Sequence, residues 1–267
     1  MKYQIGKVAK LLDISAQGLR LYEKEGIIFP ERKESGYRTY KRLDITSLLR
    51  ARTYQKYGFS LQEIKEMLNT DNLEYLYNKY ENHEKVLEQL ILKQQLELNR
   101  LRYTKELLDF YNMNPKYIGF EYRPTLYRFE YMYNDELLIS EESYTLLNNL
   151  ISLAPLSFSS IRNEWVDVLD DKDIYYSGIA IKKDDADLLQ CKDLFSNDNY
   201  LDSVYCLTTF IKVDDNHSFL DCLSRIKEYI NDNSLEVIGD IISESIVSYN
   251  KKDNYTRIRK IWIPIKE

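Results

Sequence analysis

The chain has 267 residues, which suits two compact domains and a connector better than one small module. Hydrophobic residues make up 44% and charged residues 30% of the sequence, a balance that supports packed cores and excludes a mainly disordered chain. Residues 1–70 contain 14 Lys and Arg against 8 Asp and Glu, a net charge of +6, whereas residues 71–267 contain 23 against 35, a net charge of −12. A basic segment attached to an acidic body indicates that one end meets nucleic acid, with chance clustering on a solvated surface as the alternative.

Other classes of protein are disfavoured by the residues that are missing. No apolar run approaches the roughly 20 residues that span a bilayer, and the first residues lack the apolar stretch of a signal peptide. We therefore expect a cytoplasmic protein with no membrane partner. Cys191, Cys206 and Cys222 are odd in number without a short pairing, and His83 and His217 stand far apart, so we expect reduced cysteines, no metal site and no cofactor.

Two short helices are predicted at the N-terminus. Residues 5–12 carry apolar side chains on one helical stripe, and the polar break after them ends the helix. Ser15 can cap a second helix over residues 16–25, whose inner face is Leu19 and Tyr22. Two short helices joined by a tight turn are typical of a helix-turn-helix.

A β-hairpin wing is predicted in residues 27–40, directly after the second helix. Gly36 supplies the permissive backbone of the turn that follows Ser35. Tyr37, Arg38 and Tyr40 can present rings, a hydroxyl and a guanidinium to a phosphate backbone. A third helix over 44–55 and a fourth from Ser60 to about Leu68 complete the predicted module.

A long helix is predicted over residues 73–112, which contain no Gly or Pro. A seven-residue repeat there predicts a seam with a partner helix and hence a homodimer. One column of the repeat consists of Leu73, Tyr80, Leu87, Gln94, Leu101 and Leu108. The other consists of Tyr77, Glu84, Ile91, Leu98 and Lys105. Most members are apolar or aromatic, whereas Gln94 and the charged members either fix the register or interrupt the seam.

The remainder of the chain changes to strand-like runs. Asn114 and Pro115 end the long helix, because proline disfavours helical backbone in the residue before it. Strand patterns from residue 117 onward alternate with helical stretches, which predicts an α+β body. A strand run followed by a helix occurs at 124–153 and again at 203–231, which suggests a duplicated half-domain.

Four ordered segments within residues 3–68, YQIGKVAKLLDIS, LRLYEKEGII, SGYRTY and YGFSLQEIKEML, resemble the DNA-binding module of the MerR family. The resemblance implies a winged helix-turn-helix, an antiparallel coiled-coil dimer, and activation of promoters by distortion of the DNA between two polymerase-contact elements. Double-stranded promoter DNA and RNA polymerase are the implied partners. Position by position, it places DNA contacts at Ala16, Gln17, Arg20, Tyr22, Tyr37, Arg38, Tyr40 and Lys56.

Two departures from the family pattern affect the operator sequence. The family often has Arg-Thr where this chain has Gln17-Gly18, and a second Tyr where it has Leu21. For Arg20 and Tyr22, simple packing and pairing on the helix surface is the alternative to a DNA contact.

Residues 115–267 resemble, more faintly, the gyrase-inhibitor-like effector domain of multidrug-responsive members of the family, chiefly in IRKIWIPI and GDIISES. This implies two strand-helix-strand-strand halves with a ligand cleft between them. The expected fold is therefore multidomain, α and α+β. Its parts are a winged helix-turn-helix domain at 1–70, a dimerisation coiled-coil helix at 71–114 and an effector-binding domain at 115–267.

Aromatic residues on the predicted strands suit a small lipophilic or aromatic effector. Glu244 is the candidate for a pocket carboxylate, although it is displaced by one residue from the family's acidic position. Lys260 stands where related domains often have a glutamate, which favours a neutral or anionic effector. Ordinary strand surface or core is the alternative for the aromatic residues, including Trp165. The candidate pocket residues are Tyr175, Tyr176, Tyr205, Phe210, Glu244, Tyr249, Lys260 and Trp262.

The sequence thus predicts a ligand-responsive DNA-binding activator that controls efflux or detoxification genes. Metal sensing is not expected, because no cysteine precedes Cys191. We expect no enzyme and no catalytic residues, since no nucleophile, phosphate-loop or metalloprotease motif occurs. Two alternatives stay open: weak hydrolysis by the C-terminal domain, and a ligand-independent architectural DNA binder.

Overall fold

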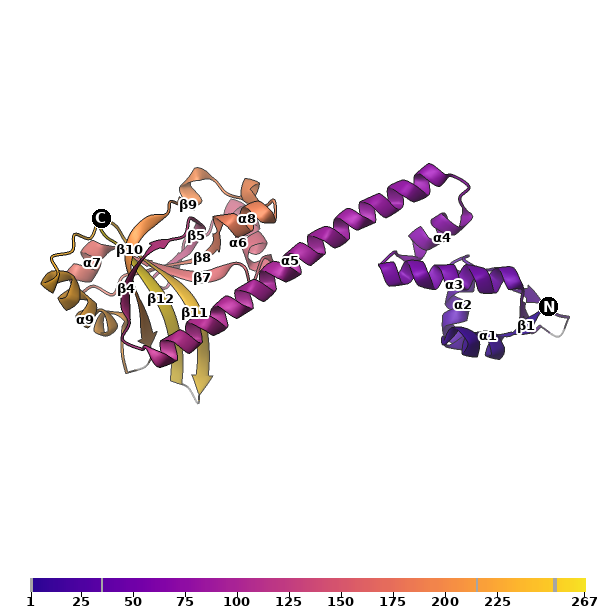
Figure 1. Ribbon diagram of the computed structural model, residues 1–267, viewed down its shortest axis with the longest axis horizontal. Helices are drawn as coiled ribbons and strands as arrows, with labels where there is room; N and C mark the ends of the chain where they lie inside the picture. The colour runs from indigo at the N-terminus through magenta and orange to yellow at the C-terminus, as the bar shows by residue number, and fades with distance from the viewer. Residues whose placement is uncertain (1, 35, 215, 252–253) are drawn as a thin grey trace. The chain divides into compact units, whose positions relative to one another are not determined.

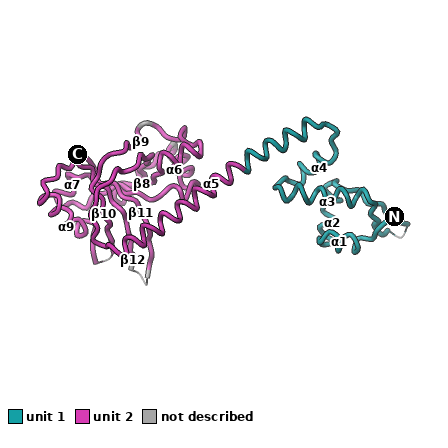
Figure 2. Tube along the Cα trace, viewed as in Figure 1, with its two compact units in different colours: residues 1–87 teal, residues 88–267 magenta. Residues whose placement is uncertain are grey.

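The computed structural model describes residues 2–34, 36–214, 216–251 and 254–267. The chain forms two compact units, residues 1–87 and 88–267 (Figure 2). The boundary falls inside one continuous helix, α5 (Leu73–Met113). The units therefore do not coincide with the predicted division into 1–70, 71–114 and 115–267, because the first turns of α5 pack within the first unit and its last turns within the second.

The first unit combines short helices with a small sheet, as the sequence predicts. The described elements are β1 (Tyr3–Gln4), α1 (Ile5–Leu12), α2 (Ala16–Lys24), β2 (Glu31–Arg32), β3 (Arg38–Tyr40), α3 (Arg42–Tyr57) and α4 (Leu61–Asn69), with the strands in the order β1-β3-β2. Ser15 caps α2, since its hydroxyl accepts a hydrogen bond from the Gly18 amide at 3.0 Å. Ser60 and Glu63 form a capping box at the start of α4.

The core of the first unit joins all four short helices and the hairpin. Leu19, Tyr40, Leu48 and Ile64 have no exposed surface. Burial of side chains of this size stabilises the unit by about 1.5–3 kcal/mol each. Gly36 (φ +78°) forms the turn of the hairpin, in a conformation that favours glycine. Ser35, predicted in the same turn, lies outside the described residues.

The first turns of α5 pack against the α3–α4 turn. Gly58 ends α3 at φ +105°, and a Cβ atom placed there would lie 3.3 Å from Nε2 of His83. The His83 ring in turn is hydrogen-bonded to the Tyr57 carbonyl. Tyr80 meets Phe59 edge-on, with ring centroids 5.9 Å apart. These contacts make the start of α5 part of the first unit.

The second unit is built on one antiparallel sheet (Figure 1). The strands follow the order β4-β10-β12-β11-β7-β8-β5-β6, and β9 pairs with β5. The strands are β4 (Ile118–Arg123), β5 (Leu126–Tyr133), β6 (Glu136–Leu137), β7 (Phe158–Asn163), β8 (Tyr176–Lys182), β9 (Tyr200–Leu201), β10 (Val204–Val213), β11 (Ile241–Lys251) and β12 (Asn254–Pro264). The helices are α6 (Glu141–Ser152), α7 (Trp165–Leu169), α8 (Lys183–Leu188) and α9 (Phe219–Asp232), with short 3-10 turns at Lys192–Leu194 and Asn197–Asn199.

The order strand-helix-strand-strand occurs twice in this unit, as β5-α6-β7-β8 and as β10-α9-β11-β12, with β6 and α7 inserted in the first copy. The two copies meet where β7 pairs antiparallel with β11, from Asn163 opposite Ile241 to Ser160 opposite Glu244. In the sheet, β10-β12-β11 mirrors β5-β8-β7 across this junction. The central pair of strands therefore joins two halves of the same design.

The two faces of the second unit's sheet differ in what covers them. On one face, Leu223 and Ile226 of α9 pack with Ile261 and Ile263 of β12. Because side chains alternate along a strand, Arg257 and Arg259 share this α9 face, whereas Lys260 and Trp262 lie on the other. The C-terminal half of α5 lies against that other face, where Phe110 and Tyr111 contact Phe210 of β10 (Figure 1).

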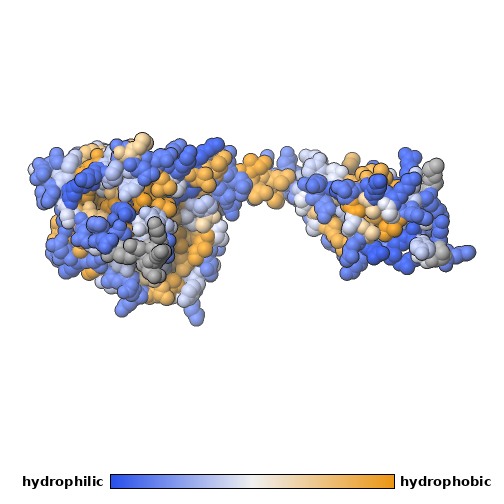
Figure 3. Space-filling model, turned by 90° about the horizontal axis from the view of Figure 1, so that it is seen from below, coloured by the Kyte–Doolittle hydropathy of each residue, from blue (hydrophilic) through white to orange (hydrophobic). Residues whose placement is uncertain are grey.

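Helix α5 contains no buried residue. Among the predicted seam positions, Leu73, Tyr77, Ile91 and Leu101 expose 65% or more of their surface. Figure 3 shows apolar surface along the middle of this helix. Apolar side chains are thus exposed along much of this helix.

Candidate DNA-binding surface and effector pocket

Helix α2 presents one polar, exposed face and one buried face. Ala16, Gln17 and Arg20 are exposed, while Leu19 and Tyr22 turn into the core of the first unit. This division follows from the helical spacing of the apolar residues. The exposed residues lie at the N-terminal half of the helix, which is the end that reads base edges in helix-turn-helix proteins.

The wing and the end of α3 add further polar groups. Tyr37 exposes 75% of its surface, and Lys56 is exposed in the last turn of α3. Arg38 is half-buried, because its Nε atom pairs with Oε2 of Glu23 in α2 at 2.5 Å. The hydrogen bond and the charge of Glu23 raise the pKa of Arg38. The pair joins the wing to α2 and leaves 27% of the Arg38 side chain exposed.

Two of the predicted DNA contacts are buried in the structure, which corrects the prediction. Tyr22 is 6% exposed and its hydroxyl donates a hydrogen bond to Oε1 of Gln55 at 2.8 Å. Tyr40 has no exposed surface, and its hydroxyl has no hydrogen-bond partner among the described residues. Burial raises the pKa of both phenols. For each ring, the gain from packing in the core is larger than the cost of burying the hydroxyl. Tyr22 and Tyr40 therefore belong to the core of the first unit and do not face solvent.

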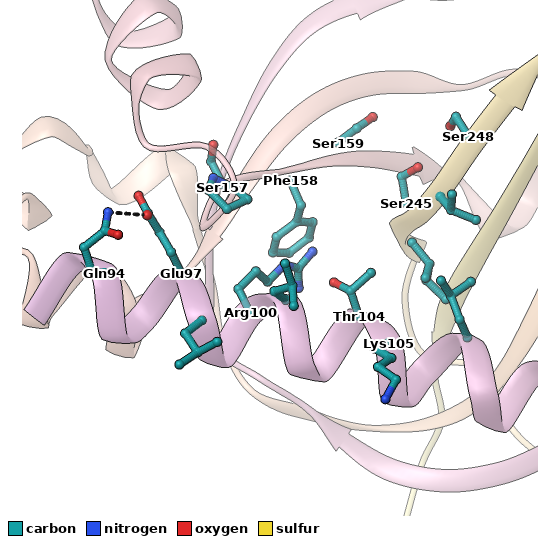
Figure 4. A pocket seen from close by; sticks show the side chains of 16 residues that line it. Gln94, Glu97, Arg100, Thr104, Lys105, Ser157, Phe158, Ser159, Ser245 and Ser248 are labelled. Atoms are coloured by element: carbon teal, nitrogen blue, oxygen red, sulfur yellow. Dashed lines mark hydrogen bonds between the residues drawn. The ribbon is translucent and has the colours of Figure 1, made fainter.

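In the second unit, a cavity of about 990 Å³ lies between α5 and the central strands β7 and β11 (Figure 4). Leu98, Leu101 and Phe158 supply apolar surface, and several serine hydroxyls supply polar groups. The remaining lining residues are Gln94, Glu97, Arg100, Thr104, Lys105, Leu108, Pro155, Ser157, Ser159, Ser245, Ile246, Val247 and Ser248. Mostly apolar walls with a few polar groups are the usual construction of a small-molecule site.

One lining residue of this cavity, Arg100, forms an ion pair that joins α5 to the sheet. Nη1 of Arg100 contacts Oε1 of Glu244, and the two side chains are 11% and 1% exposed. The Arg100 guanidinium also lies 5.0 Å from the ring centroid of Phe158, as Figure 4 shows. Burial, and then the charge of Glu244, raise the pKa of Tyr103. Oε2 of Glu244 is buried and lacks a hydrogen-bond partner in the described part of the chain.

None of the eight predicted pocket residues lines this cavity. Glu244 comes nearest, since it binds the lining residue Arg100. Lys260 instead pairs with Glu121 at 2.6 Å, and Nε1 of Trp262 donates to the same carboxylate at 2.6 Å. Trp262 is 1% exposed, so it belongs to the core of the sheet.

The aromatic candidates are distributed over the sheet rather than gathered in one place. Phe210 packs against α5, and Tyr205, on the same strand β10, lies beside Phe120 on the α9 face of the sheet. Tyr176 stacks under the guanidinium of Arg162 at 3.8 Å, Tyr249 is half exposed, and Tyr175 lines a different, smaller pocket. These residues therefore do not share one pocket, and Tyr175 lines a pocket on the other face of the sheet from Phe210.

The lining residues contributed by α5 escaped the sequence analysis. In the sequence, Leu98 and Leu101 stand out only as members of the predicted dimer seam, not as pocket residues. Arg100 lies between them with nothing in the sequence to connect it with Glu244, 144 residues later. Among the described residues, no group of three or more His, Cys, Asp or Glu side chains is arranged to hold a metal ion. None of the helices that the structure describes is long and apolar enough to cross a membrane.

The helix pair, the hairpin and the two helices behind it define the first unit as a helix-turn-helix module of a regulatory protein. Residues 3–71 match the model of the MerR HTH family of regulatory proteins. The regulator CueR of Escherichia coli O157:H7 is 31% identical over 97 residues, which are 36% of this chain and 67% of that relative. The chain therefore belongs to the MerR family.

Other relatives match a smaller share of this chain or share less of its sequence. The regulator CueR of Vibrio cholerae serotype O1 is 45% identical over 69 residues, or 26% of this chain. The chain thus spans half the length of the first curated relatives that it matches. A cryo-EM structure titled EcmrR-DNA complex in EcmrR-RPo covers 99% of this chain with 14% identity and a TM-score of 0.36, too low to support an argument about the second unit.

Proposed function

We propose that this chain is a ligand-responsive, DNA-binding transcription regulator whose first unit binds double-stranded promoter DNA. The observation that carries the proposal is the exposed face of α2, with Gln17 and Arg20, beside the exposed Tyr37 of the wing. The net charge of +6 over residues 1–70 supplies the attraction to phosphate. Ala16 is a further proposed contact to the bases. Arg38 and Lys56 are the proposed contacts to the DNA backbone.

The regulator acts in this proposal as a homodimer joined through residues 73–112. The exposed apolar residues of α5 support that partner surface. Two recognition helices held by a coiled coil address half-sites roughly 34–36 Å apart, or a multiple of that distance. Bending or untwisting the DNA between them costs on the order of 1–6 kcal/mol, which phosphate contacts offset. RNA polymerase is the proposed further partner, and activation by promoter distortion is the proposed mechanism.

The second unit serves in this proposal as a gyrase-inhibitor-like effector-binding domain. Its two strand-helix-strand-strand halves support the assignment, as does the cavity beside the junction of those halves. A volume of about 990 Å³ lies at the upper end of the range for sites that take drug-sized molecules. The proposed effector is therefore a small lipophilic or aromatic compound, and the proposed targets are genes for efflux or detoxification.

Helix α5 provides the route from effector to DNA in this proposal. Arg100, Leu101 and Thr104 belong both to the cavity wall and to the helix that carries the dimer seam. A compound in the cavity contacts these side chains directly. It changes the dimer only to the extent that it binds one arrangement of α5 more tightly than another.

The test uses the full chain and a panel of lipophilic dyes. We expect some dyes to raise the melting temperature of the second unit, because a ligand that binds only the folded state stabilises it. Phe158→Ala should abolish the shift, whereas Tyr144→Ala, at a half-exposed position on α6 outside the cavity, should keep it. Footprinting of the DNA upstream of the protein's own gene, with and without an active dye, then tests DNA binding and distortion. Protection of that DNA without any dye effect would indicate a ligand-independent architectural binder.

A further inference from the structure

We propose a second ligand site, on the α9 face of the second unit's sheet, for a small carboxylic acid that carries a hydrogen-bond donor next to its carboxylate. The site is a pocket of about 160 Å³ that shares no lining residue with the cavity beneath α5. Its lining residues are Ile161, Asn163, Asp173, Tyr175, Val213, Ser218, Phe219, Arg257 and Arg259. The inference is independent of the proposed function.

Arg259 contributes a buried guanidinium to the lining of this pocket. Arg259 is 6% exposed, its Nε atom is buried without a hydrogen-bond partner, and it forms no ion pair with any residue that the structure describes. Arg257 lines the same pocket and adds a second positive charge. A buried charge normally has a partner of opposite sign, because its desolvation is otherwise uncompensated. The missing partner at this place is an anion.

The start of α9 adds a partial positive charge, part of which the capping carboxylate of Asp221 offsets. This helix has 14 residues, and Ser218 and Phe219, its N-cap and first residue, both line the pocket. The amide groups at a helix N-terminus point outward and carry a partial positive charge. In this pocket that charge is added to the guanidinium groups of Arg257 and Arg259.

Asn163 contributes to the same pocket a buried oxygen that accepts no hydrogen bond from the described residues. Asn163 is 2% exposed, and its Nδ2 atom donates to the Ile174 carbonyl at 2.9 Å. That bond fixes the amide, and its Oδ1 atom is left buried with no partner among the described residues. The carboxylate of Asp173, which is exposed, lines the same pocket and offers further acceptors. A bare anion would leave the Asn163 oxygen unsatisfied and would face the Asp173 carboxylate, so the ligand must also donate a hydrogen bond.

The size and the walls of the pocket indicate an organic ligand of few atoms. Ile161, Val213 and Phe219 give it an apolar side. Its volume is well below the roughly 300–1,000 Å³ of sites for drug-sized compounds. A short carbon chain with a carboxylate at one end and a hydroxyl or ammonium group beside it satisfies the guanidinium groups, the free acceptors and the apolar wall together.

The test is calorimetric titration of the full chain with propionate, L-lactate and L-alanine at constant ionic strength. These acids share a carbon skeleton and differ only in the group next to the carboxylate, which is hydrogen, hydroxyl or ammonium. We expect lactate or alanine to bind at least about tenfold more tightly than propionate, since a site with unpaired acceptors discriminates against a ligand that lacks the donor. The better of the two then identifies the donor as hydroxyl or ammonium.

Variants separate this site from general charge effects. Arg259→Gln should abolish the binding, and Arg257→Gln should weaken it. Lys227→Gln should leave it unchanged, because Lys227 lies on α9 outside the pocket and pairs with Asp171. Melting curves check folding, and if Arg259→Gln does not fold, Arg257→Gln decides. Absence of binding by both donor acids, equal binding of propionate, or full binding by the folded arginine variants would each overturn the proposal.

Discussion

Arg100 and Glu244 are 144 residues apart in the chain and form a nearly buried ion pair between α5 and β11. The pair is the polar contact through which the cavity wall contributed by the helix is held to the sheet. One carboxylate oxygen of Glu244 is left without a partner among the described residues, so Arg100 carries most of the compensation for this buried charge.

Arg100→Ala should destabilise the second unit by about 3–5 kcal/mol, because it leaves a buried carboxylate uncompensated. The double variant Arg100→Met with Glu244→Met should be near the unaltered protein or more stable, since apolar residues of similar volume can replace a buried pair. Urea denaturation monitored by a probe in the second unit provides the measurement. A double variant as unstable as Arg100→Ala would show that the charge pair is not the cause.

Arg38→Ala should weaken binding to all duplexes to a similar degree and lower the slope of log affinity against log salt by about one. In the structure this guanidinium pairs with Glu23, which would compete with a phosphate for it. Glu23→Gln should therefore strengthen DNA binding. Salt titrations of fluorescence anisotropy measure both effects, with Arg225→Ala in the second unit as the control. A loss limited to one base position would contradict the phosphate assignment.

Ile91→Asp should convert the dimer into monomers with little affinity for the operator. Ile91 is 68% exposed on α5 and lies outside the cavity lining, so the charge acts on the proposed seam without disturbing the pocket. Leu101, in contrast, belongs to both. Light scattering gives the oligomeric state, and Gln89→Asp, two residues earlier on the same helix and also exposed, is the matched control. An unchanged dimer in Ile91→Asp would disprove the seam.

Glu130 should contribute to the loss of stability in acid. Burial alone would raise the pKa of this carboxyl, but hydrogen bonds and charges from Arg162 and Arg128 outweigh burial and lower it. A carboxyl whose pKa is lower in the folded state stabilises the fold above its ordinary value of 4.5, and this contribution is lost as the pH falls through the lowered pKa. In Glu130→Gln, unfolding monitored between pH 6 and pH 2 should therefore depend less steeply on pH. An unchanged pH profile would exclude Glu130 as a source.

The fold of the first unit could be predicted from the sequence, because the residues that specify its helices and its turn lie within short segments. Ser15 and Ser60 cap the helices that their spacing predicts, and Gly36 forms the predicted turn. The burial of Tyr22 and Tyr40 was harder to predict, because a tyrosine on a helix or strand satisfies both a core position and a polar surface. Only the three-dimensional packing around each ring decides between the two.

The cavity beside α5 could not be predicted in the same way, because its lining residues come from segments that are far apart in the sequence. Phe158 and Ser159 of β7, the bulged segment of β11 and the residues of α5 from Gln94 onward meet only after the sheet has formed. Strand patterns in the sequence place the tyrosines on strands. They do not tell which of these tyrosines lie on the face of the sheet that α5 covers. The pairing of β7 with β11 is what brings the walls together.

That central pairing also explains why two copies of one design occur in a single chain. If either half stood alone, β7 or β11 would be an unpaired edge strand with its amide and carbonyl groups open to another sheet. Such a half would have to associate with a second molecule and would be exposed to aggregation at low concentration. Because both halves belong to one polypeptide, their association is intramolecular. Strands β7 and β11 therefore pair at any concentration of the protein.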